Sequence, residues 1–354
     1  MPMNRANAFC QRFGLRLPIL LAPMAGACPP SLSIAVANAG GLGACGALLM
    51  QPDEIRAWAE TVRDGSNGAF QMNLWIPDPA PSRDAAHEAR LRDFLGRWGP
   101  PVPADAADLA PLDFAAQCDA ILAAGPPIVS SIMGLFPPDF VVRMKVQGIA
   151  WFATVTTLAE ARAAEAAGAD VVVAQGAEAG GHRGSFDPAE AERRQVGLFA
   201  LLPAVTDAVR VPVVATGGIG DARGVAAALL LGASAAQIGT GFLRCPEAAI
   251  HPVWAEAIGR TAPEDTLVSR AFSGRAARAI ATDYGHAASA PDAPAPAPYP
   301  VQRGLTGVMR AAGQTAGDLQ RMQVWAGQSA AMARAEPAAE AVRRLWDGAR
   351  ALLG

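Results

Sequence analysis

The chain has 354 residues, of which 51% are hydrophobic, and a formal net charge of −3. This length allows one large domain or two, with a sizeable core. No basic block is present, so we expect neither a nucleic acid nor a membrane as partner. The five cysteines lack CxxC spacing, which indicates structural thiols in a reducing compartment, the cytoplasm, and no metal site.

The N-terminal region has two interpretations. Three arginines precede the apolar run 17–22, an arrangement shared by signal peptides and by a buried first barrel strand. Pro18 and Pro23 interrupt this run and later segments repeat its pattern, so we favour the strand. A membrane-spanning helix needs about 20 nearly continuous apolar residues. Glycine, proline and asparagine interrupt this region every few residues, and this excludes a membrane-spanning helix here.

Short apolar runs alternate with helical stretches along most of the chain. Their continuous apolar content is typical of parallel strands that are covered on both faces. The predicted strands are Ile19–Ala22, Gly43–Cys45, Ala69–Leu74, Ile128–Ser131, Ile149–Ala153, Val171–Ala174, Val213–Ala215 and Ala235–Ile238. The predicted helices are Pro52–Arg63, Pro138–Val146, Thr157–Ala167, Gly197–Ala208, Asp221–Leu231, Pro246–Gly259, Val308–Ala333 and Pro337–Leu353. Asp221 is an expected N-cap, Gly168 an expected C-cap, and Pro337 an expected first helical residue.

Eight strand–helix units predict an α/β fold, a (β/α)8 TIM-type barrel. The main alternative is a doubly wound sheet, which carries its nucleotide-binding glycines after the first strand. Here the glycine-rich loops follow the sixth, seventh and eighth strands. We assign residues 1–76 and 128–260 to the barrel. Residues 77–127 and 261–354 do not follow the repeat and are expected to form a smaller, mainly helical substrate or cap region with the C-terminal helices.

Three glycine-rich loops carry the chemical signal. The first, 174–184, contains His182, and the others are 215–220 and 237–241. Glycine lets the backbone approach a ligand closely, and a phosphate site after strands seven and eight is characteristic of this barrel. A histidine on such a turn can move a proton near neutral pH. The loops predict a phosphate-bearing cofactor with a histidine beside it.

The predicted strand ends are poor in charge and rich in amides, hydroxyls and glycine. Such a lining suits a neutral ring held by hydrogen bonds, with its phosphate on backbone N–H groups. FMN therefore suits the site better than a sugar phosphate. Each of three residues has two possible roles. Glu178 either contributes to the ligand site or only accepts hydrogen bonds from neighbouring backbone, and Arg183 is either a solvated loop residue or a substrate ligand. Met24 either belongs to the hydrophobic core or lies beside the ring of the cofactor.

Several motifs lie at these strand ends: Ala22-Pro23-Met24-Ala25-Gly26, the Asn73 strand, the loop 175–184, Thr216–Ile219 and Gln237–Thr240. Together with segments 270–275 and 299–302, they resemble the nitronate monooxygenases, formerly called 2-nitropropane dioxygenases. The resemblance spans nearly the whole chain and implies an FMN-dependent barrel with His182 as the catalytic base. The cofactor-binding residues are then expected to be Met24, Asn73, Gln175, Gly180, Gly181, Gly217, Gly218, Gln237, Gly239 and Thr240.

The resemblance implies that alkyl nitronates are oxidised with O2 to a carbonyl compound and nitrite through a flavin semiquinone, and it leaves nitroalkanes open as further substrates. His182 would remove the α-proton of a nitroalkane or, when protonated, hold a nitronate. The same glycine–histidine motif occurs in flavin-dependent enoyl-ACP reductases and NADH:quinone reductases. An NAD(P)H-dependent reductase of enoyl thioesters or quinones is therefore the alternative, and a flavin-binding sensor is a third. Lys145 is the only lysine in the chain, so it alone could anchor a phosphate through a lysine. The sequence does not decide whether the protein forms a homodimer.

Overall fold

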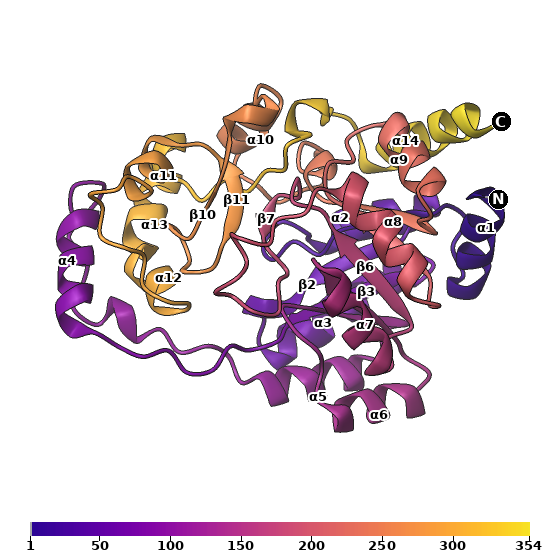
Figure 1. Ribbon diagram of the computed structural model, residues 1–354, viewed down its shortest axis with the longest axis horizontal. Helices are drawn as coiled ribbons and strands as arrows, with labels where there is room; N and C mark the ends of the chain where they lie inside the picture. The colour runs from indigo at the N-terminus through magenta and orange to yellow at the C-terminus, as the bar shows by residue number, and fades with distance from the viewer. Residues whose placement is uncertain (1) are drawn as a thin grey trace.

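A computed structural model describes residues 2–354 (Figure 1). Eight parallel strands form one sheet in the order β1-β9-β8-β6-β5-β4-β3-β2. They are β1 (Ile19–Leu21), β2 (Gly43–Gly46), β3 (Phe70–Trp75), β4 (Ile128–Ile132), β5 (Ala150–Val155), β6 (Val171–Gln175), β8 (Val213–Thr216) and β9 (Ala235–Ile238). A parallel bridge between Leu20 and Leu42 joins the two edge strands. The predicted barrel and all eight predicted strands are confirmed, with ends shifted by at most two residues.

Helices cover the outside of the barrel. Those between consecutive strands are α2 (Pro30–Ala39), α3 (Pro52–Gly65), α5 (Phe114–Ala124), α6 (Pro138–Val146), α7 (Leu158–Ala166), α8 (Leu198–Ala208) and α9 (Ala222–Leu230). Asp221 caps α9 as predicted, because its carboxylate accepts hydrogen bonds from the backbone N–H groups of Arg223 and Gly224. The C-cap of α7 is Ala167 rather than the predicted Gly168, which follows it with a φ of +95°.

The two ends of the chain also pack on the barrel. Helix α1 (Pro2–Phe13) was not predicted, and it lies at the N-terminal end of the strands. Its Phe9 and Phe13 pack on Phe152 of β5, with ring centroids 6.1 and 5.0 Å apart. The last helix, α14 (Ala338–Leu353), packs on α2 and α9. Pro337 is its N-cap, not its first residue as predicted.

Two predicted helices are shorter than expected. The stretch 246–259 is helical only in α10 (Pro252–Ile258), which begins after its N-cap His251. The stretch 308–333 contains α13 (Gly307–Ala316), which ends where Gly317 adopts a φ of +63°. A left-handed glycine is a common helix terminator because it carries no Cβ.

A second layer covers the C-terminal mouth of the barrel. It contains α4 (Ala85–Leu95), α11 (Asp283–Ala288), α12 (Val301–Leu305) and α13, seen at the left of Figure 1. It also contains an antiparallel sheet that was not predicted, in the order β10 (Thr266–Ser269), β11 (Ala277–Ile280) and β7 (Gly181–His182). The division into barrel and cap stays a prediction, and the packing of α5 on α3 and of α14 on α2 favours assigning both helices to the barrel.

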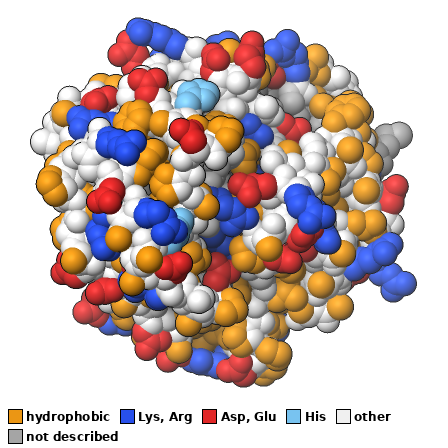
Figure 2. Space-filling model, turned by 60° about the vertical axis from the view of Figure 1, so that its left-hand side comes forward, with side chains coloured by type: hydrophobic (Ala, Val, Ile, Leu, Met, Phe, Trp, Pro, Cys, Tyr) orange, Lys and Arg blue, Asp and Glu red, His pale blue; other side chains and the backbone are white. Residues whose placement is uncertain are grey.

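Within residues 2–354, no helix combines the length and the apolar character needed to cross a lipid bilayer. Figure 2 shows one face of the molecule, on which acidic and basic side chains are interspersed. On that face, charge does not gather into a large patch of one sign, as a nucleic-acid footprint would require.

Candidate functional site

All predicted site residues line a single cavity at the C-terminal ends of the barrel strands, with a volume of about 210 Å³. They are Met24, Asn73, Gln175, Gly180, Gly181, His182, Gly217, Gly218, Gln237, Gly239 and Thr240. These residues come from five strand ends, which meet only because the barrel closes. The C-terminal mouth is the place where such barrels carry their active sites.

His182 is held by both the barrel loop and the cap sheet. Its backbone pairs with Ala277 of β11, and its Nε2 lies 2.8 Å from Oγ of Ser273. The ring also packs edge-on against Trp75 and Trp325, with centroids 4.6 and 5.0 Å away. The imidazole is therefore fixed on three sides while it faces the cavity.

The surroundings of His182 disfavour its charged form. Burial, followed by the positive charges of Arg275 and Arg303, lowers its pKa from 6.5 to about 3. His182 is consequently neutral at pH 7. This value lies well below the expected one near working pH, and the role of His182 as the catalytic base stays a prediction.

Gln175 supports the loop that carries His182. Its Nε2 donates to the carbonyl oxygen of His182 (3.1 Å), and its Oε1 accepts from the N–H of Gly184 (2.8 Å). Both ends of this amide are thus engaged with the loop. Its remaining hydrogen and lone pair are all that it can offer to a ligand.

Arg183 and Glu178 have structural contacts. Arg183 is buried, and its guanidinium donates to the carbonyl oxygens of Gly176 (2.6 Å) and Gln175 (3.2 Å). Neither interpretation of Arg183, as a solvated residue or a substrate ligand, is therefore correct. Glu178 accepts from the N–H of Leu198 at the start of α8, which matches the backbone-bonding interpretation and the dipole of that helix.

Two amides at the cavity have fixed orientations. Asn73 donates through Nδ2 to the carbonyl oxygen and to Oγ of Ser130, at 3.1 and 3.0 Å, so its Oδ1 stays available as an acceptor. Gln71 donates through Nε2 to Oε1 of Gln237 (3.0 Å), so Nε2 of Gln237 stays available as a donor. These two amides thus offer one acceptor and one donor, as a ring edge with both N–H and carbonyl groups requires.

The glycines keep side chains out of the cavity wall. Gly217 and Gly218 have φ values of +104° and +70°, and a Cβ at Gly180 would lie 2.5 Å from the nitrogen of Gly327. A Cβ at Gly181 would meet nothing within 4 Å, so bare backbone faces open space there. These positions let a ligand lie directly on the main chain.

Two buried polar atoms of the lining lack a hydrogen-bond partner. They are Nε1 of Trp254 and Oε1 of Gln323. A buried polar atom without a partner is costly, so a ligand with hydrogen-bonding groups would stabilise the site. The lining therefore suits a flavin. Lys145 does not contribute, because it pairs with Asp170, which precedes β6 at the opposite end of the barrel.

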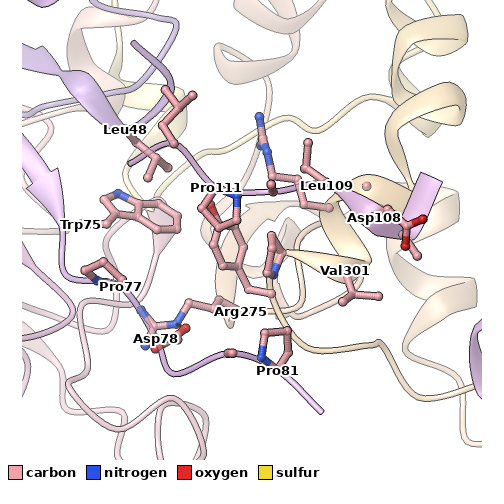
Figure 3. Close-up of a pocket in the computed structure, with 18 of the residues that line it drawn as sticks. Leu48, Trp75, Pro77, Asp78, Pro81, Asp108, Leu109, Pro111, Arg275 and Val301 are labelled. Carbon is pink, nitrogen blue, oxygen red and sulfur yellow. Dashed lines mark ion pairs between the residues drawn. The ribbon is translucent and has the colours of Figure 1, made fainter. Parts of the chain in front are cut away.

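A second, larger hollow, here called the entrance pocket, has a volume of about 1090 Å³. It shares Trp75, Tyr299 and Arg303 with the cavity, so the two are continuous. In Figure 3, Trp75, Pro77 and Asp78 lie on one side, with Arg275 beside Asp78, and Leu109 and Val301 lie on the other. Arg275 and Asp78 form an ion pair at 3.1 Å.

Sequence reasoning missed several residues around His182. They are Ser273, Trp75, Trp254, Gln323, Trp325 and Arg303. Trp75 directly follows a predicted strand and could have been found from that position. Trp254 lies on a predicted barrel helix rather than at a strand end, and the others lie in the C-terminal region, where no periodicity connects them with the barrel.

The fold and the cavity define a barrel enzyme whose ligand site lies in the mouth of the barrel, with a histidine on its wall. A family model described as "Nitronate monooxygenase" matches residues 8–348. The chain therefore belongs to the nitronate monooxygenase family, a family of oxidoreductases.

Similar proteins agree with this assignment. A nitronate monooxygenase of Paraburkholderia phytofirmans is 40% identical, over 96% of this chain and 94% of that protein. One from Pseudomonas aeruginosa is 38% identical, over 97% and 99%. The structure of nitroalkane oxidase from Streptomyces ansochromogenes has a TM-score of 0.85 and 36% identity, over 96% and 98%. FabK from Thermotoga maritima has a TM-score of 0.76 and 28% identity, over 98% and 96%.

Proposed function

We propose that the protein binds FMN and oxidises alkyl nitronates with O2 to a carbonyl compound and nitrite. The observation that carries the proposal is the neutral, fixed His182 on the wall of a cavity with amide and glycine lining. The names of the relatives and of the nitroalkane oxidase support the substrate class.

The cavity residues divide the binding of FMN between them. Asn73 and Gln237 would bond the ring edge, while Gly217, Gly218 and Thr240 would hold the phosphate on backbone N–H groups. Met24 lies against Gly239, with its sulfur 3.3 Å from the position of a Cβ there, and would contact the ring. FMN supplies the redox chemistry when bound, and the protein supplies position and polarity.

The pKa of His182 favours a nitronate over a neutral nitroalkane as the substrate. A base whose pKa lies near 3 is poorly matched to removing a proton at neutral pH. A nitronate has already lost that proton. The positive charges of Arg275 and Arg303, which disfavour a charged His182, favour an anion at the same place.

Anaerobic mixing of the purified yellow protein with ethylnitronate tests the proposal. We expect the flavin absorbance to change with ethylnitronate, and nitrite to be released when O2 is admitted. NADH and NADPH should leave the flavin oxidised. A flavin absorbance that does not change on addition of ethylnitronate would refute the proposed function.

The alternative, an NAD(P)H-dependent reductase of enoyl thioesters or quinones, has one observation in its favour. The FabK structure shares the fold across nearly the whole chain. Rapid two-electron bleaching by NADH or NADPH in the same apparatus would establish a reductase, and enoyl thioesters and quinones would then be tested as acceptors.

A further inference from the structure

The entrance pocket contains a cationic side chain that the proposed function does not use. Arg310 of α13 lines this pocket, where its Nε donates to Oγ1 of Thr306 (3.1 Å) and its Nη2 donates to the carbonyl oxygen of Arg303 (3.0 Å). Burial, followed by the charge of Arg303, lowers its pKa to about 10. A partly desolvated guanidinium beside a like charge is stabilised by an anion.

The other arginines of the pocket already have acidic partners. Arg83 and Arg275 each form ion pairs with carboxylates, Arg275 through its Nε alone, while its buried Nη1 and Nη2 have no hydrogen-bond partner among the described residues. Among residues 2–354, no carboxylate pairs with Arg303 or Arg310. Asp105 also lines the pocket without an ion pair in the described part of the chain, so the two unpaired arginines on the α12–α13 side leave a net positive charge in the entrance pocket.

The remaining wall of the entrance pocket is apolar. It contains Leu48, Leu49, Ile76, Leu109, Phe114, Val301 and a series of prolines. Leu49 and Leu109 are 47% and 44% exposed, although both are large apolar side chains. A volume of about 1090 Å³ slightly exceeds the range of pockets for drug-sized ligands, roughly 300–1,000 Å³. A nitroethane molecule would leave nearly all of this space empty.

We propose that the entrance pocket binds an amphipathic anion. Its carboxylate or phosphate end contacts Arg310, and its apolar body lies along Leu49 and Leu109. Because Trp75 and Tyr299 line both hollows, the other end of such a ligand reaches the cavity beside His182.

The catalytic consequence concerns the substrate class. The preferred nitronate carries a long apolar chain that ends in a second anionic group. This consequence rests on the proposed function, whereas the binding of an amphipathic anion does not. The two claims can therefore fail separately.

Titration calorimetry on the protein as purified tests the binding. The probes are dodecanoate, dodecyl phosphate, dodecan-1-ol and acetate, each below the concentration at which it self-associates. We expect dodecanoate or dodecyl phosphate to bind at least tenfold more tightly than dodecan-1-ol, and acetate not to bind. The tighter of the two anions identifies the end group. Equal affinity for the alcohol and both anions would overturn the proposal.

Substitutions locate the anionic end. Arg310→Met should weaken the binding of the preferred anion at least tenfold and leave dodecan-1-ol unaffected, while Arg310→Lys should retain most of the affinity. Arg343→Met is the matched control, because Arg343 is exposed on α14. Unchanged affinity in Arg310→Met would overturn the assignment. If this variant folds poorly, the comparison of anions with dodecan-1-ol on the unaltered protein still tests whether the pocket prefers an amphipathic anion.

A separate assay keeps the two claims apart. Nitrite release from ethylnitronate reports on the proposed function alone. A protein that binds dodecanoate but releases no nitrite would refute the proposed function and leave this inference intact. A protein that releases nitrite but binds neither anion would refute the inference and leave the function intact.

Discussion

The pH dependence of nitroalkane oxidation tests the protonation state of His182. Its pKa is lowered to about 3 by burial and by two neighbouring arginines. At pH 5, about 1% of such a histidine is protonated, against about 97% for an ordinary histidine of pKa about 6.5. We therefore expect kcat/KM for nitroethane, however small, to stay level between about pH 8 and pH 5, where an ordinary base would lose about 30-fold.

The assay is the initial rate of nitrite release after nitroethane is added in its neutral form at low concentration, measured before it ionises in solution, so that no nitronate contributes. Flavin absorbance is recorded at each pH. Enzyme returned to neutral pH must regain its activity, which excludes inactivation. Arg275→Gln is the informative variant. It removes one of the charges that lower the pKa of His182, so any decline in rate should move to higher pH. A decline centred near pH 6.5 in the unaltered protein, with flavin still bound, would refute the reasoning.

The same pKa predicts how stability depends on pH. Below about pH 6.5 the unfolded chain protonates this histidine, whereas the folded protein does so only near pH 3. The free energy of unfolding therefore falls by up to about 1.4 kcal/mol per pH unit as the pH drops through this window. Between pH 7 and pH 5 the loss is up to about 2 kcal/mol. Urea denaturation should show a smaller loss for His182→Asn than for the unaltered protein.

Three substitutions test the site. His182→Asn should retain FMN and lose most activity on nitroalkanes, with a milder loss on nitronates; equal losses would argue against a role in proton removal. Gly180→Ala places a Cβ 2.5 Å from the nitrogen of Gly327 and should cost about 1–3 kcal/mol in urea unfolding, whereas Gly224→Ala should not destabilise the protein. Gln71→Leu frees the amide of Gln237 and should weaken FMN binding several-fold in a fluorescence titration of the apoprotein. An unchanged dissociation constant would contradict that orientation.

The barrel could be predicted because its signal is local. Each buried parallel strand is a continuous apolar run, and each run is followed by a glycine loop or a helix start. Helix α1 was missed because its arginines and the following apolar run resembled a targeting segment. Residues 308–333 were predicted as one helix because Gly317 was given too little weight as a terminator.

The site was predictable in part for a similar reason. Every residue chosen from a strand end or glycine loop lines one cavity, because barrel closure brings the C-terminal ends of the strands together. Ser273 and Trp325 approach His182 through the two-residue strand β7 and its partner β11. Such short pairings leave no pattern in a sequence. The pKa of His182 could not be predicted either, because desolvation and two arginines that are far away in the sequence set it.

The return of α14 to the barrel has a practical consequence. Its Val342, Leu345 and Trp346 are buried, and the helix packs on α2 and α9. Both chain ends therefore emerge on the side of the molecule away from the cap, as Figure 1 shows. A tether or fusion partner joined to either end would point away from the barrel mouth, so the enzyme could be immobilised on a support with its substrate route open.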